Sequence, residues 1–347
     1  MKNYKNKNPL YNNYLTESVV AEEQAKYGST KQCLYCYKQM PSESTTDYHA
    51  ACCKKFFGQA YQPQIDYTFN DLEALALQYV NTHTVVTGVQ SKVSLSWHKK
   101  QSKNELKKLT IVGLYGDYIL KPPSKYYTNL PELEDCTMKM AAVCGLKTVP
   151  HTLIKLKDET LCYLTKRVDR HRQGSYHMED MCQLTNRLTD DKYKGSHEQI
   201  GKVLLKYSST AMLDVSNFYE YVLFSYFTGN ADMHLKNFSL LETATRGAYT
   251  LCPAYDMLST ALVNPTDQEE LALTLNGKKS KLNYTDFLAA FTTNGLTKKL
   301  LDATLQNFYY CQLEMFAVID QSFLPEDLKL NYYLLLKARL QKLINKV

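Results

Sequence analysis

Short β-like runs are concentrated before residue 170 of this chain, and helix-like segments dominate after it. Runs rich in β-branched, aromatic and other apolar residues lie at Val93–Trp97, 108–114 and 116–121, and such runs are typical of short strands. Residues 132–144 carry a helical apolar stripe, and residues 146–170 resemble a two-stranded hairpin followed by a hinge. This order predicts an α+β fold with a small β-rich lobe and a larger, mainly helical lobe.

The length of 347 residues is compatible with two lobes around a cleft, because single cores usually stop growing at about 250 to 300 residues. A helix-like stretch begins at Tyr67. Later helices are expected at 178–188, 197–207, 217–229 and most of 283–347. The expected organisation is a polar N-terminal arm at 1–30, a Cys-rich unit at 31–60, the small lobe at 61–168 and the helical lobe at 169–347.

Composition favours a packed, soluble protein, since apolar residues make up 44% of the chain and charged residues 22%. The sequence has no run of about 18 apolar residues, and its polar start lacks a hydrophobic signal core. We therefore expect a cytoplasmic protein that does not bind membranes. The net charge of +6 is not gathered into a dense Lys/Arg block, so direct binding to nucleic acid is not favoured.

The loop-like string GNADMHLKNFSLL carries the residue types that phosphoryl transfer requires. Asp232 and Asn237 lie five residues apart, and Asp256 follows nineteen residues after Asn237, beyond an expected hairpin. An Asp that orients a hydroxyl, an Asn on a metal and a further Asp on the metals form the usual phosphotransfer set. By itself an Asp and an Asn at this spacing is a weak signal, but His234 and Lys236 lie in the same loop.

A second candidate is Lys121, at the end of the expected strand YILKP. Alternation along a strand turns its side chain away from the face of Leu120, toward the expected cleft, where an ammonium can hold phosphates. Glu134 in the next helix is its candidate partner, with Glu132 and Asp135 as neighbouring alternatives. A surface lysine at a strand end remains the simpler interpretation.

Cysteine usage also indicates a possible metal site. Cys33 and Cys36 form a C-x-x-C pair, and Cys52 lies sixteen residues beyond it, with either His49 or Cys53 as the fourth ligand. Such a set can hold zinc tetrahedrally, and a structural zinc contributes about 10 to 16 kcal/mol to a small unit. The alternative is a reduced cysteine cluster without metal.

Several longer strings resemble the HipA-type serine/threonine kinases of bacterial toxin–antitoxin systems. These strings are YILKP, GLKTVP, TKRVDR, HMEDMCQ with KY further on, GNADMHLKNFSLL and CPAYDMLST, spread over about residues 84 to 290. The resemblance implies a protein-kinase-like fold that binds Mg-ATP between its lobes. It also implies a toxin whose targets include aminoacyl-tRNA synthetases.

Carried over by position, the resemblance makes Asp232 the catalytic aspartate, in a loop shared with His234 and Lys236. It also implies that Lys121 binds the phosphates of ATP and that Asn237 and Asp256 bind Mg²⁺. The strand leading to Lys166 and Val168 would present backbone groups to adenine. The matching residues Asp169, Glu179, Asp180 and Gln183 are interpreted as structural.

The phosphate loop departs from a G-x-G-x-x-G pattern and resembles the short glycine loop of the family, with Gly88, Gln90 and Lys92 as its ATP-binding candidates. Loop serines are autophosphorylated in this family, and one of their positions is occupied here by Val85. Thr87 is therefore the candidate autophosphorylation site, with Thr84 and Ser91 nearby. A phosphate there adds charge of about −2 and can displace such a loop.

Only about 80 residues precede this loop, so the chain resembles the short kinase of split, HipT-like systems. The partners implied are a helix-turn-helix antitoxin, a small HipS-like protein, and DNA through the antitoxin alone. Two other functions stay open. One is a phosphoinositide-type lipid kinase, which can carry the same Asp-x-His-x-x-Asn pattern, and the other is a non-catalytic ATP-binding co-repressor scaffold.

Overall fold

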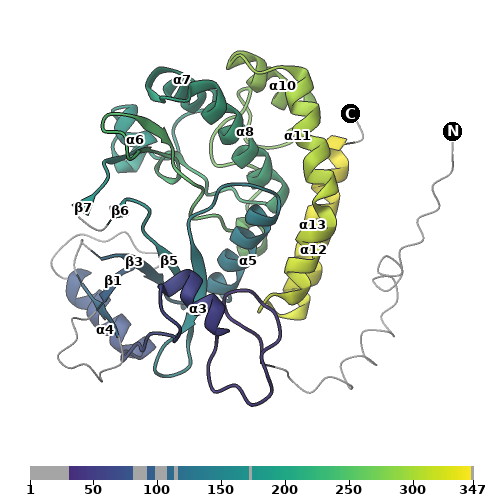
Figure 1. Ribbon diagram of the computed structural model, residues 1–347. Coiled ribbons are helices and arrows are strands. Elements are labelled where there is room, and N and C mark those ends of the chain that lie inside the picture. Colours follow the sequence, from purple (N-terminus) through teal and green to yellow (C-terminus); the bar gives the residue numbers. More distant parts are fainter. Residues whose placement is uncertain (1–30, 81–91, 98–107, 113–115, 172–173, 345–347) are drawn as a thin grey trace, which may run out of the picture. The chain divides into compact units, whose positions relative to one another are not determined.

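The computed structural model describes residues 31–80, 92–97, 108–112, 116–171 and 174–344 (Figure 1). The chain divides into two compact units, Met1–Gln62 and Pro63–Val347. The N-terminal arm expected at 1–30 lies outside the described residues. Among these residues no helix combines the length and hydrophobicity that crossing a bilayer requires.

The described part of the first unit, residues 31–62, contains a tight turn and one helix. The turn is closed by a bridge between Gln32 and Gln39. Helix α3 (Ala50–Phe57) ends at Gly58, whose φ of 71° is in the left-handed region that favours glycine. A small group of side chains forms the buried interior: Cys33, Leu34, Tyr37, Met40, Tyr48, Cys53, Phe56 and Phe57.

The second unit begins with a β-rich lobe, as the sequence predicts. After helix α4 (Phe69–Val80), an antiparallel sheet has the order β2-β1-β3-β5-β4. Its strands are β1 (Val93–Trp97), β2 (Leu109–Ile111), β3 (Tyr118–Lys121), β4 (His151–Lys155) and β5 (Leu161–Lys166). Helix α5 (Leu130–Val143) connects β3 to β4 and packs on β4 and β5 (Figure 1).

The helical lobe follows the sheet. Its short strands are β6 (Arg170–His171), β7 (Gly174–Ser175), β8 (Met178–Asp180), β9 (Ser239–Glu242) and β10 (Tyr249–Leu251). Its helices are α6 (Met181–Leu184), α7 (His197–Tyr207), α8 (Ala211–Thr228), α9 (Thr260–Val263), α10 (Tyr284–Thr293), α11 (Lys298–Tyr310), α12 (Gln312–Gln321) and α13 (Glu326–Ile344), with 3-10 turns at Thr189–Asp191 and Leu235–Asn237. In Figure 1, α12 and α13 lie side by side, and α12 contacts α5 of the sheet lobe.

The helix predicted at 178–188 is wrong. Met178–Asp180 instead forms strand β8, which pairs with β9 in a small sheet of order β10-β9-β8. Asp180 then begins the short helix α6 with a capping box, in which its side chain accepts from the Gln183 amide and the Gln183 side chain accepts from the Asp180 amide. Pairing with a distant strand therefore outweighs the local helical pattern.

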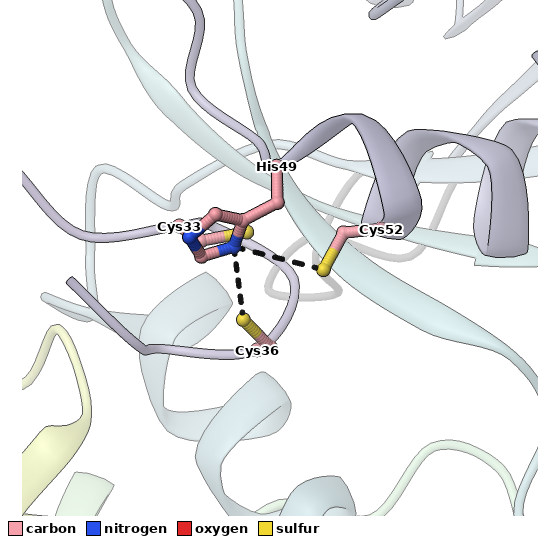
Figure 2. A group of neighbouring side chains, drawn as sticks. All are labelled: Cys33, Cys36, His49 and Cys52. Carbon is pink, nitrogen blue, oxygen red and sulfur yellow. Dashed lines mark hydrogen bonds between the residues drawn. The ribbon is translucent and has the colours of Figure 1, made fainter. Parts of the chain in front are cut away.

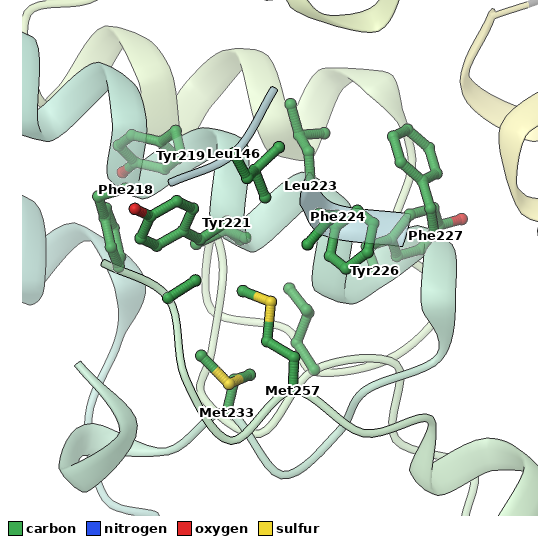
Figure 3. Close-up of a cluster of buried hydrophobic side chains, with 14 of the residues drawn as sticks. Leu146, Phe218, Tyr219, Tyr221, Leu223, Phe224, Tyr226, Phe227, Met233 and Met257 are labelled. Carbon is green, nitrogen blue, oxygen red and sulfur yellow. The ribbon is translucent and has the colours of Figure 1, made fainter. Parts of the chain in front are cut away.

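The core of the helical lobe is organised by α8. Its aromatic side chains, including Phe218, Tyr219, Phe224 and Phe227, are almost fully buried (Figure 3). Met233 and Met257 lie beneath this helix in the same cluster. Each of these methionines follows one of the aspartates that the sequence singles out, so the core anchors both loops.

Candidate active site

Lys121 is buried at the end of β3, with only 3% of its surface exposed. Strand β3 sets it opposite Tyr163 of β5, and its ammonium lies 5.4 Å from the centre of the Tyr163 ring. Lys121 Nζ donates to Glu134 Oε1 at 2.5 Å and also to Asp256 Oδ1. Of the three acidic residues considered at the start of α5, Glu134 is thus the one that reaches the lysine.

The three charges in this cluster shift one another's pKa. Burial disfavours the Lys121 ammonium, but Asp256 and Glu134 more than offset this and hold its pKa above the usual range. Burial raises the pKa of Glu134 to about 7, and the charge of Lys121 limits that rise. Burial would also raise the pKa of Asp256, yet Lys121 and then Lys92 keep it well below its usual range.

Asp256 lies in the loop that follows β10, and it joins the two lobes of the second unit. Its Oδ2 accepts from Lys92 Nζ at 2.8 Å, while its Oδ1 accepts from Lys121. Its φ of 60° is left-handed, a conformation that aspartate tolerates better than most residues. A β-bridge between Thr148 and Ala254 holds this loop against the sheet lobe.

The loop with Asp232 starts where α8 stops. Gly229 ends the helix with a φ of 70°, and a Cβ there would lie 2.8 Å from Ala261 Cβ and from Leu335 Cδ2, so both conformation and space require glycine. The buried Asn230 then accepts from the Asp232 amide at 3.0 Å through its Oδ1. These contacts fix the backbone on which the Asp232 carboxylate is carried.

Asn237 and Asp232 are held together inside this loop. Asn237 Nδ2 donates to the Asp232 carbonyl oxygen at 2.9 Å. This hydrogen bond fixes the orientation of the amide, whose Oδ1 is the atom that can bind a cation. The Tyr255 hydroxyl donates to the Lys236 carbonyl at 3.1 Å, which ties the neighbour of Asn237 to the neighbour of Asp256.

The Asp232 carboxylate has a partner that sequence reasoning missed. The Tyr193 hydroxyl donates to Asp232 Oδ1, and its ring meets the His234 ring edge-on at 5.0 Å. Burial and the adjacent Asp232 raise the pKa of Tyr193, and burial lowers the pKa of His234. Tyr193 belongs to the KY pair of the sequence resemblance, which is the signal that could have identified it.

Lys236, expected beside the catalytic aspartate, is directed elsewhere. Its ammonium donates to Asp180 Oδ2 at 2.8 Å, so it fastens the loop to the cap of α6. Asp169 likewise accepts from Arg167 and Arg170, in agreement with the structural interpretation of these acidic residues.

The adenine candidates are defined only in part. Lys166 and Arg167 donate their backbone amides to Pro150 and Asp117, so these two donors are already used within the sheet lobe. Val168 follows them and packs against the main core. Gly88, Gln90 and Thr87 lie outside the described residues.

In the first unit, the proposed zinc ligands do come together. The ligand atoms of Cys33, Cys36, His49 and Cys52 all lie within 4.8 Å of one another (Figure 2). His49, rather than Cys53, is the fourth member of this group.

A sheet lobe carrying a buried Lys–Glu pair, joined to a helical lobe carrying the two aspartate loops, defines a protein-kinase-like fold. Solved structures agree. The HipA chain in a Shewanella oneidensis complex of HipA, HipB and operator DNA is similar with a TM-score of 0.64 and 21% identity, covering 78% of this chain and 71% of that one. The Helicobacter pylori proinflammatory kinase CtkA is similar with a TM-score of 0.53 and 19% identity, covering 82% and 96%.

The chain belongs to the family of the HipA-like C-terminal domain, whose model matches residues 84–311. A Sinorhizobium fredii protein named "Putative kinase Y4dM" is 35% identical over 210 residues, which is 56% of this chain and 49% of that protein. A Haemophilus influenzae protein named "Putative kinase" is 28% identical over 162 residues, or 43% and 46%. The chain therefore matches about half the length of these curated relatives.

Proposed function

We propose that this protein is an ATP-dependent serine/threonine protein kinase that uses Mg²⁺. The observation that carries the proposal is the convergence of Lys121, Glu134 and Asp256 across the two lobes, next to a loop that presents Asp232 and Asn237. Ion-paired lysine and glutamate with metal-binding Asp and Asn are the parts that protein kinases use for phosphoryl transfer.

The donor set fits Mg-ATP. Asp256 and Asn237 offer carboxylate and amide oxygens, which are the ligands that Mg²⁺ prefers, and Lys121 offers an ammonium for phosphate oxygens. When bound, Mg²⁺ would neutralise charge on the phosphates. In the structure Asp256 and Lys121 form an ion pair. Asp256 thus already faces a positive charge, as it would with Mg²⁺, and Lys121 already faces a negative charge, as it would with a phosphate.

Asp232 would orient the substrate hydroxyl and accept its proton. Its carboxylate accepts a hydrogen bond from the Tyr193 hydroxyl, and its backbone is held by the side chains of Asn230 and Asn237. Lys92, at 2.8 Å from Asp256, would add a second positive charge near the phosphates. Gly88 and Gln90 would contribute the glycine loop, and Thr87 would receive an autoregulatory phosphate.

The toxin role extends the proposal. The similar HipA chain is found in a complex with HipB and operator DNA, and by analogy this kinase would pair with a helix-turn-helix antitoxin that contacts the DNA. A small HipS-like protein would complete the system. The substrate would be a translation component such as an aminoacyl-tRNA synthetase.

The test is a phosphotransfer assay of the full-length chain with Mg²⁺ and radiolabelled ATP, using bacterial lysate in one arm and lipid vesicles in the other. Label is expected on serine or threonine of a protein, with a fraction on the chain itself near Thr87. Asp232→Asn should lower the rate by at least about 100-fold, because a positioned acid–base group contributes about that much. Asp327→Asn, at an exposed position of α13, is the matched control.

Each alternative has its own result in this assay. Label on lipid rather than protein would assign a lipid kinase. Absence of label in both arms would leave an ATP-binding scaffold. Activity of Asp232→Asn within a few-fold of wild type, with an unchanged circular dichroism spectrum, would overturn the proposed site.

A further inference from the structure

The geometry points to a structural zinc site in the first unit, held by Cys33, Cys36, His49 and Cys52 and separate from phosphoryl transfer. These four residues come from the tight turn and from the start of α3 (Figure 2). Three thiols and one imidazole are a common ligand set for structural zinc. All ten cysteines of the chain are free, so no disulfide competes for these sulfurs.

The distances match a tetrahedral ion. Zn–S bonds of 2.3 Å and Zn–N bonds of about 2.0 to 2.1 Å place neighbouring ligand atoms about 3.5 to 3.8 Å apart. The Cys36 Sγ and His49 Nδ1 atoms are 3.4 Å apart, and Cys52 Sγ and His49 Nδ1 are 3.9 Å apart. All four ligand atoms lie within 4.8 Å of one another, so shifts of about 1 Å would bring them to these separations.

The imidazole is already oriented as a ligand. His49 Nδ1 faces the thiols, while Nε2 lies 3.1 Å from the Gln39 carbonyl oxygen, which can accept a hydrogen bond from the ring N–H. A metal-bound histidine almost always donates its second nitrogen to a carbonyl, carboxylate or water, since this fixes the tautomer and the ring. Gln39 is therefore the outer partner of the site.

The turn that carries the first two ligands holds Cys33 in the interior. Cys33 is fully buried, and its backbone amide donates to the Lys38 carbonyl at 2.9 Å. The turn is closed by a hydrogen bond from the Tyr37 amide to the Cys33 carbonyl at 2.9 Å, and Tyr37 takes a left-handed φ of 64°. A tyrosine in that conformation is uncommon, so the surroundings must hold it there.

The size of the unit supplies the reason for a metal. The unit spans Met1–Gln62, and the buried interior of its described part is small. Below about 70 to 80 residues a single hydrophobic core rarely supplies more than about 3 to 5 kcal/mol, and disulfides or a metal often add to it. Zinc would link the turn to α3 and take the place of a larger core.

The experiment uses the full-length chain, purified without chelator, with zinc measured by mass spectrometry. About one zinc per chain is expected from the donor set. Reconstitution with Co²⁺ should give the visible absorption of a tetrahedral thiolate site. Wild-type protein without zinc that also fails to bind Co²⁺ would overturn the proposal, as would a disulfide among Cys33, Cys36 and Cys52 in freshly purified protein.

Variants separate metal binding from simple packing. Cys52→Ala should lose the zinc, whereas Cys53→Ala, the same change at the adjacent buried cysteine, should keep it. His49→Ala should lose zinc and His49→Cys should regain it, because four cysteines also bind zinc. Zinc retained in both Cys52→Ala and His49→Ala would place the metal elsewhere. None of these readouts depends on kinase activity.

Discussion

Asp256 is the residue on which two positive charges converge. Lys121 pairs with it from the end of β3, and Lys92, the residue before β1, also pairs with it. The backbone of Asp256 adopts a left-handed φ. A buried charge is costly unless it is paired, so the buried Lys121 ammonium depends on its acidic partners Asp256 and Glu134, whereas Lys92 is exposed. The same arrangement holds the proposed phosphate-binding cation and the proposed metal-binding carboxylate in place.

The Tyr193 hydroxyl allows a test of how the Asp232 carboxylate is positioned. Its hydrogen bond to Asp232 Oδ1 restricts the carboxylate, and a hydrogen bond to a charged group is worth about 1.5 to 3 kcal/mol. Given the proposed kinase activity, Tyr193→Phe should lower kcat about 10-fold or more and leave the KM for ATP unchanged. Steady-state phosphotransfer rates measure both.

Tyr207→Phe, at an exposed tyrosine that ends α7, is the matched control and should not change either constant. A higher kcat in Tyr193→Phe would contradict positioning. It would mean that the hydroxyl competes with the substrate for Asp232.

At the scale of elements, helix α8 positions the loops that carry Asp232 and Asp256. Its buried aromatic face packs on Met233 and Met257, and its C-terminal glycine turns the chain into the Asp232 loop (Figure 3). The neighbouring helix α7 begins with a capping box at Ser196 and Gln199. Its first residue, His197, is almost fully buried between Phe218 and Phe238.

His197 predicts how stability depends on pH. Burial lowers its pKa to about 3, and neither ring nitrogen has a hydrogen-bond partner among the described residues. Between pH 6.5 and pH 3, His197 is protonated in the unfolded chain but not in the folded protein. The free energy of unfolding therefore falls as the pH drops from about 6.5 toward 3. At pH 5 this costs about 2 kcal/mol relative to pH 7.5.

Urea unfolding at these two pH values measures the effect. His197→Phe should reduce the loss of stability at pH 5, although the buried His151, whose pKa burial lowers to about 4, acts in the same direction. An equal loss in His197→Phe and wild type would show that His197 is protonated in the folded protein.

At the scale of the second unit, the two lobes meet through a few specific contacts. The Lys121–Asp256 pair, the Thr148–Ala254 bridge and the packing of α12 on α5 join the sheet lobe to the helical lobe. A ligand that engages residues of both lobes adds its binding free energy to the folded state alone. Stabilisation by ligand is therefore a readout of the whole site.

Mg²⁺ with a non-hydrolysable ATP analogue should raise the unfolding free energy by about 2.7 kcal/mol at 100 times its dissociation constant. Thermal unfolding with the analogue is compared with and without Mg²⁺. Asp256→Asn should lose most of the Mg²⁺-dependent part of the shift. The same shift in Asp256→Asn as in wild type would remove Asp256 from the metal site.

Much of the fold and of the candidate site can be read along the chain, because short-range spacing is set by chain connectivity. The β-rich and helical halves and the hairpin between Asn237 and Asp256 follow from local patterns. So does the presence of Asp232 and Asn237 in one loop. The C-x-x-C turn is equally local, since its two sulfurs are separated by only three peptide bonds.

Only the tertiary structure decided which of several nearby candidate residues reaches the site. Glu134 meets Lys121, whereas Asp135 pairs with Lys139, because consecutive residues of a helix point in different directions from its axis. His49 joins the thiol group instead of Cys53 because α3 turns the side chain of Cys53 into the interior. Tyr193 reaches Asp232 across 39 residues. Nearby residues of similar type give the same signal in the sequence. Their environments differ only because they pack against segments that are distant along the chain.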